Sequence, residues 1–115
     1  MNIVKTSAGL TKMQAYKLRS SKESHSFKDA AGSEVEVSAW MNYEDENSKG
    51  EVVNILAIMT PEGEVFAGQS ETFKRSFFEA ADIFGDELEA IKVITNVARS
   101  GREYVDCEAC RVRGE

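Results

Sequence analysis

The sequence predicts a mainly β domain with one helix, and three stretches carry that prediction. Residues 34–43 (EVEVSAWMNY) alternate with period two, which is typical of a β-strand. Residues 50–85 combine an apolar strand, a tight turn, a return strand and a helix. Residues 91–111 alternate on both sides of the turn Arg99–Arg102 (RSGR), which predicts a closing hairpin.

The start of the chain contains weaker signals. Residues 1–10 show no hydrophobic periodicity, so we expect a flexible N-terminal arm ahead of a single domain at residues 11–115. Thr11–Arg19 (TKMQAYKLR) alternates well enough to predict the first strand. Polar residues 20–33 would connect it to the second strand, with Phe27 as the buried anchor of this connection.

In the second predicted strand, period two separates two faces. The apolar face should meet the core, and it consists of Val35, Val37, Ala39, Met41 and Tyr43. The opposite face carries Trp40 among polar neighbours. The alternation therefore predicts an exposed indole, and a large apolar ring on an outer face indicates a binding role.

The central stretch predicts a hairpin followed by the helix. Val52–Met59 is a nearly continuous apolar run, Pro61-Glu62-Gly63 is typical of a turn, and Glu64–Gly68 would be the return strand. The helix should run from about Glu71 to Phe84, with Ser70 or Thr72 as its N-cap and Gly85 after its last residue. Its core-facing stripe consists of Phe73, Phe77, Ala80, Ala81 and Phe84, and its water-facing side of Lys74, Arg75, Glu79 and Asp82.

This order of elements predicts an OB-like five-stranded barrel. Three strands, the third continued as a hairpin, precede the helix, and a two-stranded hairpin follows it. In an OB fold the helix lies between the third and fourth strands and closes one end of the barrel. A split barrel or an α+β sandwich would also fit this order.

The composition indicates a globular domain. The chain has 115 residues, of which 42% are hydrophobic and one is a proline. No apolar run approaches the roughly 18 to 20 residues of a membrane span, and the polar start MNIVKTSAG does not resemble a signal peptide. We therefore expect a soluble, intracellular protein that contacts no membrane.

The net charge of −6 is unevenly distributed along the chain. Residues 1–33 carry six basic against two acidic side chains, residues 34–90 three against fourteen, and residues 91–115 five against four. A local basic stripe can hold phosphates if the acidic side chains lie on another face. An ordinary solvated surface would also account for this pattern.

No catalytic constellation stands out, and we expect that the protein is not an enzyme. The sequence contains no phosphate-binding loop, no glycine-rich dinucleotide turn and no nucleophile elbow. Cys107 and Cys110 would point to opposite faces of a strand, and His25 is the only histidine, so we predict no metal site and buried, reduced thiols. No cofactor is expected.

Aromatic residues with basic neighbours are the feature that points to a function. Nucleobases stack on aromatic rings while lysines and arginines follow the phosphates. The candidate nucleic-acid-binding residues are Tyr16, Lys17, Arg19, Lys28, Trp40, Tyr43, Lys49, Lys92, Arg99, Arg102 and Tyr104. Core packing is the alternative for Tyr16 and Tyr43. Glu36, Asp106 and Glu108 share the outer faces and would have to lie off the path of the nucleic acid.

Three stretches resemble the single-stranded-DNA-binding proteins of small tailed phages that replicate by protein priming: SFKDAAGSEVEVSAW, GEVVNILAIMTPEGEVFAGQSETF and EAIKVITNVARSGREYVDCEA. The resemblance covers roughly Ser26 to Val112. It rests on an SFK…G turn, an acidic-Gly turn before a Ser/Thr-rich helix start, and a glycine-containing final hairpin. It implies an OB-like fold and cooperative or semi-cooperative coating of displaced strands, without sequence preference, during phage DNA replication.

Two functions from different classes are therefore predicted. The first is single-stranded-DNA binding in the host-cell cytoplasm, with DNA and phage replication proteins as partners; residues 111–115 (RVRGE) are unlike the acidic tail through which the wider class recruits such proteins. The second is a protein–protein interaction module, such as a phage-encoded inhibitor of a host nuclease or defence complex that mimics DNA. A small structural subunit is a third interpretation, which only the absence of catalytic motifs supports.

Overall fold

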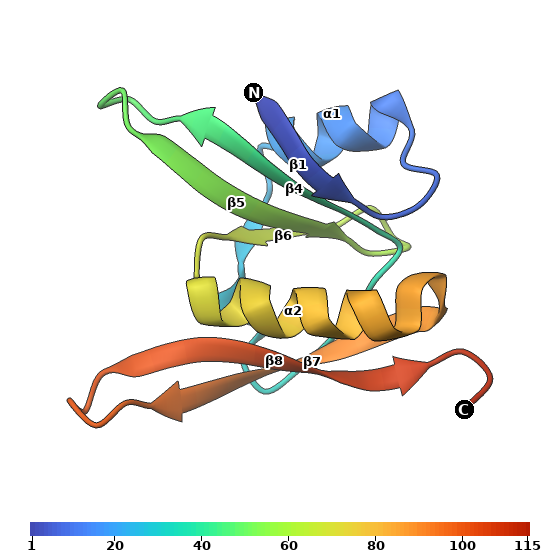
Figure 1. Cartoon of the computed structure of the whole chain (residues 1–115), viewed down its shortest axis with the longest axis vertical. Coiled ribbons are helices and arrows are strands. Elements are labelled where there is room, and N and C mark those ends of the chain that lie inside the picture. The colour runs from blue at the N-terminus through green and yellow to red at the C-terminus, as the bar shows by residue number, and fades with distance from the viewer.

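Two β-sheets and two α-helices are stacked in four layers in the computed structural model, which describes all of residues 1–115 (Figure 1). The layers are helix α1, a five-stranded sheet, helix α2 and a three-stranded sheet, in that order. Strands account for 43% of the residues and helices for 26%, so the predicted mainly β class is confirmed.

The five-stranded sheet has the strand order β1-β4-β5-β6-β2. Its strands are β1 (Asn2–Thr6), β4 (Ala39–Glu46), β5 (Val52–Met59), β6 (Val65–Gly68) and β2 (His25–Ser26). β2 runs parallel to β6, and all other neighbours are antiparallel. The predicted hairpin of β5 and β6 is present, with its turn at Pro61-Glu62-Gly63.

The three-stranded sheet has the order β3-β7-β8 and is entirely antiparallel. β3 is short (Glu34–Glu36), whereas β7 (Leu88–Val97) and β8 (Glu103–Val112) form the long closing hairpin. Val105 and Cys107 are buried on its inner face, as the alternation predicts.

The two helices are α1 (Lys12–Ser20) and α2 (Glu71–Phe84), with short 3-10 turns η1 (Phe27–Ala30) and η2 (Gly85–Glu87). The bounds of α2 match the prediction, and Ser70 is its N-cap because its Oγ accepts a hydrogen bond from the Phe73 N–H at 3.2 Å. Neither helix has the length and apolar character needed to cross a membrane.

Two apolar cores hold the layers together. The smaller core lies between α1 and the five-stranded sheet, and Leu18 is the α1 residue buried in it. The larger core surrounds α2 between the two sheets. Its members include Trp40, Leu56, Ile58, Phe73, Phe77, Ile91, Val93 and Val105. Since α2 contacts both sheets, it joins them into one fold.

The predicted five-stranded OB-like barrel is wrong, and so is a single helix between the third and fourth strands. The segment 34–43 is divided between two sheets, because β3 pairs with β7 whereas β4 pairs with β5. The division falls at two adjacent residues: the Val37 N–H donates to Glu89 O, and the Ser38 N–H donates to Met59 O. With α2 between sheets that share no ladder, no barrel can close.

Thr11–Arg19 forms a helix and not the predicted first strand. The Thr11 Oγ1 accepts from the Gln14 N–H at 3.1 Å, and the Gln14 Oε1 accepts from the Thr11 N–H at 3.0 Å. This capping box satisfies N–H groups that a helix start otherwise leaves unpaired. Over only nine residues the apolar positions fit both the strand period of two and the helical period of 3.6. The Thr-x-x-Gln spacing of the capping box favours the helix.

Residues 1–10, expected to be a flexible arm, contain the edge strand β1. β1 pairs with β4 from Asn2 opposite Glu44 to Thr6 opposite Met41. A register shift between Ile3 and Lys5 bends the strand. The pairing depends on β4, far away in the sequence, so the local pattern of residues 1–10 could not reveal it.

The predicted exposure of Trp40 is wrong, and so is the single core face of residues 35–43: Val35 and Val37 pack in the same core as Trp40, whereas Ala39, Met41 and Tyr43 lie in the other core. Met41 and Tyr43 lie on the α1 side of β4, and Trp40 lies on the α2 side. Only 8% of Trp40 is exposed, and its ring meets Phe77 edge-on at a centroid distance of 5.3 Å. Since a helix covers each face of this sheet, both faces of the strand are core.

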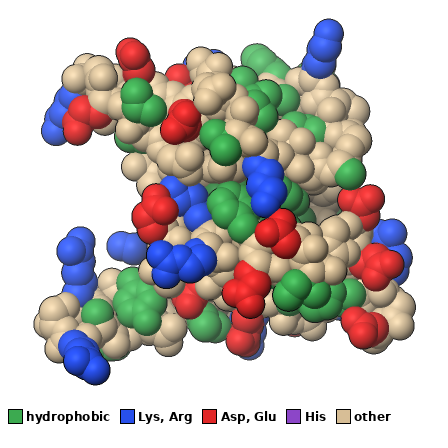
Figure 2. Space-filling model, viewed as in Figure 1, with side chains coloured by type: hydrophobic (Ala, Val, Ile, Leu, Met, Phe, Trp, Pro, Cys, Tyr) green, Lys and Arg blue, Asp and Glu red, His purple; other side chains and the backbone are tan.

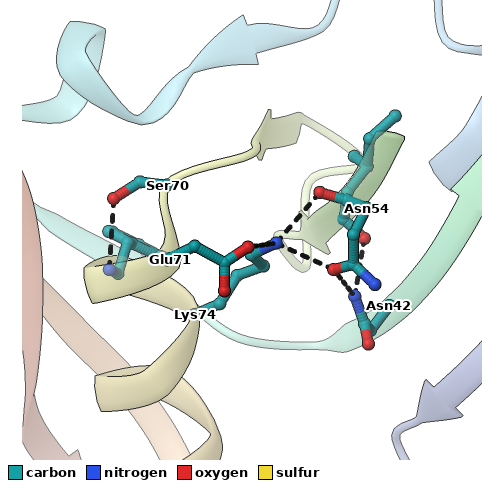
Figure 3. Close-up of polar contacts among 7 residues, drawn as sticks. Asn42, Asn54, Ser70, Glu71 and Lys74 are labelled. Atoms are coloured by element: carbon teal, nitrogen blue, oxygen red, sulfur yellow. Dashed lines mark hydrogen bonds and ion pairs between the residues drawn. The ribbon is translucent and has the colours of Figure 1, made fainter. Parts of the chain in front are cut away.

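Lys74, predicted to face water, is buried. Its Nζ donates to Asn54 Oδ1 at 2.8 Å, to Asn54 O at 3.1 Å and to Glu71 Oε1 at 2.8 Å (Figure 3). These three acceptors match the three donors of an ammonium group, so its charge is compensated. Lys74 thereby ties α2 to β5, and the hydrogen bond from Lys74 lowers the pKa of Glu71.

The two cysteines lie in different environments, and only one of them is buried as predicted. Cys107 is buried in the larger core and its Sγ lies 3.7 Å from Phe73 O, whereas Cys110 is exposed. Burial raises the pKa of Cys107 to about 12.

We expect one thiol to react in the native protein and two in the unfolded protein. The Cys107 thiol is inaccessible and stays protonated, whereas Cys110 is accessible to a thiol reagent at pH 8. Mass spectrometry after brief labelling counts the modified thiols, and rapid double labelling under native conditions would contradict the burial of Cys107.

Cys107 should also make the free energy of unfolding fall as the pH rises from about 8.5 to 12. Over this range the unfolded chain releases a proton that the native state retains.

Candidate nucleic-acid interface

The turn between β7 and β8 presents two arginines to solvent. The Ala98 N–H donates to Arg102 O at 2.9 Å and the Gly101 N–H donates to Ala98 O at 2.8 Å, which fixes the turn. Gly101 has φ +83°, a conformation that glycine adopts without a steric penalty. Arg99 and Arg102 are both exposed and take part in no ion pair. Figure 2 shows basic side chains around the end of this hairpin, at the lower left.

A small pocket of about 190 Å³ lies next to this turn, and Tyr104 is one of its walls. The lining residues are Lys28, Ala31, Thr95, Glu103, Tyr104 and Val105. Tyr104 is half-buried, so its ring is held by the sheet but remains accessible. Lys28 is exposed and, like Arg99 and Arg102, forms no ion pair. We call Lys28, Arg99, Arg102 and Tyr104 the basic hairpin end.

Lys28 reaches this place because the preceding residue is anchored. The Phe27 ring stacks on Phe73 of α2 at a centroid distance of 3.8 Å, which confirms its predicted role as an anchor. Gly68 makes room for this ring, since a Cβ there would lie 2.8 Å from Phe27 Cδ2. The packing of Phe27 thus brings η1, with Lys28, to the edge of the closing hairpin.

Tyr16, Lys17 and Arg19 do not belong to this cluster. They lie on α1, in the outermost layer on the far side of the five-stranded sheet (Figure 1). Tyr16 is 66% exposed, so the core alternative does not apply to it. Arg19 is bound to Asp45 at 2.9 Å, and this hydrogen bond lowers the pKa of the Asp45 carboxyl. Arg19 is therefore less available to a phosphate than an unpaired arginine.

The other predicted residues are also separate from the hairpin end. Trp40 and Tyr43 are core residues, and burial raises the pKa of the Tyr43 hydroxyl. Lys49 lies in the turn between β4 and β5, which projects from the same side of the molecule as the β7–β8 turn (Figure 1). Lys92 lies opposite Glu34 of β3 and Glu108 of β8, so two carboxylates occupy the neighbouring positions.

Two of the acidic residues that would repel phosphates contact other groups of the protein. Glu36 is near Arg111, which is also close to Glu34 and Glu89. The Asp106 side chain is turned toward α2, where its Oδ1 accepts from Ser76 Oγ at 2.6 Å and from the Cys107 N–H at 2.8 Å. Both groups therefore have partners within the protein, whereas Glu108 is exposed opposite Lys92 on the closing hairpin.

Sequence reasoning missed a groove between α2 and the five-stranded sheet. It has a volume of about 440 Å³ and is lined by Asn42, Asn54, Glu71, Lys74, Arg75 and Phe78. We call this the α2 groove. The only signal in the sequence was a polar asparagine inside each of two apolar strands, Asn42 in β4 and Asn54 in β5.

A larger hollow of about 690 Å³ lies at the C-terminal end of α2. Four acidic residues line it, namely Glu36, Asp82, Asp86 and Glu89. Its two basic residues are already paired, Lys5 with Asp82 at 2.9 Å and Arg113 with Glu89 at 3.6 Å. This charge distribution disfavours phosphate binding.

Comparisons with known proteins add no relative. No protein-family model, no curated protein and no solved structure matches the chain.

Proposed function

We propose that the protein binds single-stranded DNA without sequence preference through the basic hairpin end. The observation that carries this proposal is a set of three cations without an ion pair near Tyr104: Lys28 lines the same pocket, and Arg99 and Arg102 lie in the adjoining turn. Cations that no carboxylate neutralises can take up phosphates, and an aromatic ring beside them can stack on a base.

The biological role that we propose follows from the resemblance described above. The protein would coat displaced strands during phage DNA replication in the host-cell cytoplasm, alongside phage replication proteins. Such a role requires no catalysis and no cofactor, since binding alone protects the strand.

The double variant Arg99→Ala/Arg102→Ala should bind every oligonucleotide more weakly. Loss of two phosphate contacts should lower the slope of log affinity against log salt by about one to two units. Fluorescence anisotropy with a labelled thymidine oligonucleotide, titrated at several salt concentrations, measures both affinity and slope. Lys12→Ala/Lys17→Ala is the matched control, because it removes two exposed charges from α1 and should change the slope less.

Two outcomes would contradict this assignment. If affinity falls while the salt slope stays constant, Arg99 and Arg102 do not contact phosphates. If the α1 variant reduces the slope by the larger amount, the nucleic acid lies on α1 and not on the hairpin end.

The second candidate function is a protein–protein interaction module that mimics DNA. The observation in its favour is the acidic hollow at the end of α2, together with the net charge of −6. A protein of this kind would bind a basic partner surface and no oligonucleotide at any salt concentration. The wild-type titration at low salt therefore separates the two functions.

A further inference from the structure

We propose that the α2 groove is a subsite for one nucleobase of the bound strand. This inference rests on the proposed single-stranded-DNA binding and extends it to residues outside the hairpin end. Three features of the groove support it: hydrogen-bonding groups without a partner, an accessible aromatic ring and an unpaired arginine.

The first feature is an unpartnered acceptor on a buried side chain. Asn42 is 3% exposed, and its Nδ2 donates to Asn54 Oδ1 at 2.8 Å and to Ile55 O at 3.0 Å. Since both partners are acceptors, the amide orientation is fixed and Oδ1 is the remaining acceptor. No protein group donates to this oxygen, and Figure 3 draws it without a hydrogen bond.

A free donor lies beside this acceptor. Asn54 Oδ1 accepts from both Asn42 and Lys74, whereas Asn54 Nδ2 donates to no protein group. The two asparagines line the same groove, so it offers one free acceptor and one free donor. The edges of nucleobases carry donors and acceptors next to each other, which makes a base a suitable ligand.

The second feature is the ring of Phe78. Phe78 is half-buried in the wall of the groove, 5.9 Å from the Trp40 ring between centroids, and Lys5 Nζ lies 5.3 Å from its centroid. Trp40 therefore fixes the ring in place while part of it stays accessible. Figure 2 shows an apolar patch with basic side chains beside it above α2. A base can stack on such a ring, and on the face that Lys5 covers it would take the place of the ammonium group.

The third feature connects the groove to the hairpin end. Arg75 lines the groove, is exposed and forms no ion pair. The next residue, Ser76, contacts Asp106 of β8 at 2.6 Å. Arg102 immediately precedes β8, and the four residues from it to Asp106 span about 13 Å at roughly 3.3 Å per residue. A strand of a few nucleotides along β8 can therefore contact Arg102 with one phosphate and Arg75 with another.

Two variants test the subsite without removing the contacts that hold the groove together. Asn54→Asp keeps the oxygen that accepts from Lys74 and Asn42 but replaces the free donor by an acceptor. Phe78→Leu keeps an apolar side chain but removes the aromatic face. Ser24→Asp controls for the added charge, and Phe84→Leu, also half-buried on α2, controls for the loss of a ring.

The readout compares a thymidine oligonucleotide with an abasic strand of equal length. We expect the wild type to prefer the strand with bases, and each groove variant to bind it on the order of tenfold more weakly while its affinity for the abasic strand changes little. Melting temperatures of the four variants verify that they are folded. Both controls should retain the preference of the wild type.

Failure of the base subsite can be distinguished from failure of the proposed DNA binding. If the wild type binds oligonucleotides and both groove variants keep its preference for bases, the subsite is wrong and the proposed function stands. If the wild type binds no oligonucleotide at low salt, both proposals are wrong. If the groove variants lose affinity equally for both strands, the groove contacts only the backbone, which also overturns the base subsite.

Discussion

Phe77→Ala is expected to lower the free energy of unfolding by about 3–5 kcal/mol. Phe77 is fully buried in the larger core, and its ring meets those of Trp40 and Phe78 at centroid distances of 5.3 and 6.2 Å. Its removal leaves a cavity at the centre of the layer that both sheets contact. A loss of this size is a large part of the roughly 5–15 kcal/mol that a domain usually has.

Urea denaturation followed by circular dichroism measures this loss. Ile83→Ala is the matched control, because Ile83 lies on the same helix with 68% of its surface exposed. The control should stay within about 0.5 kcal/mol of the wild type. Equal midpoints for the two variants would show that Phe77 is not the packing centre of α2.

The bounds of helix α2 could be predicted because their signals are local. The N-cap Ser70, the phenylalanines at helical spacing and Gly85, with φ +54°, all lie within sixteen residues of sequence. Each signal acts on the backbone within a turn or two, so no knowledge of the rest of the fold is needed. The closing hairpin was predictable for the same reason, through alternation on both sides of Gly101.

Sheet membership could not be predicted because it depends on distant partners. Val37 and Ser38 continue an unbroken period-two pattern, and yet their N–H groups bond to different sheets. The pattern shows neither where the chain passes from one sheet to the other nor what covers each face, so it places Val35 and Val37 with Met41 although they pack in the core of Trp40. The errors about the barrel and about Trp40 both follow from this limit.

The candidate sites likewise combine residues that are close in sequence with residues that only the packing of distant elements brings together. Arg99, Arg102 and Tyr104 are close in sequence, and the hairpin turn alone brings them together. Lys28 joins them only through the packing of Phe27 on α2. The α2 groove combines side chains from β4, β5 and α2, so its free donor and acceptor become visible only when those elements are assembled.

Trp40→Ala is expected to destabilise the protein by about 3–5 kcal/mol, as for other buried aromatic residues. The indole lies between β4 and α2, edge-on to Phe77, and its removal would uncover the inner side of Phe78. Trp40→Phe should recover part of the loss because it refills part of the cavity. Denaturant unfolding followed by circular dichroism compares the two variants without relying on the missing fluorophore.

Tyr16→Ala is the control for this prediction, since Tyr16 is an aromatic residue with 66% of its surface exposed. It should change the free energy of unfolding by no more than about 0.5 kcal/mol. If Trp40→Ala were as stable as Tyr16→Ala, the indole would not be part of the core, and Trp40 would again be a candidate for stacking on DNA. Buried as it is, Trp40 should act on DNA binding only indirectly, because it supports the ring of Phe78 that forms one wall of the α2 groove.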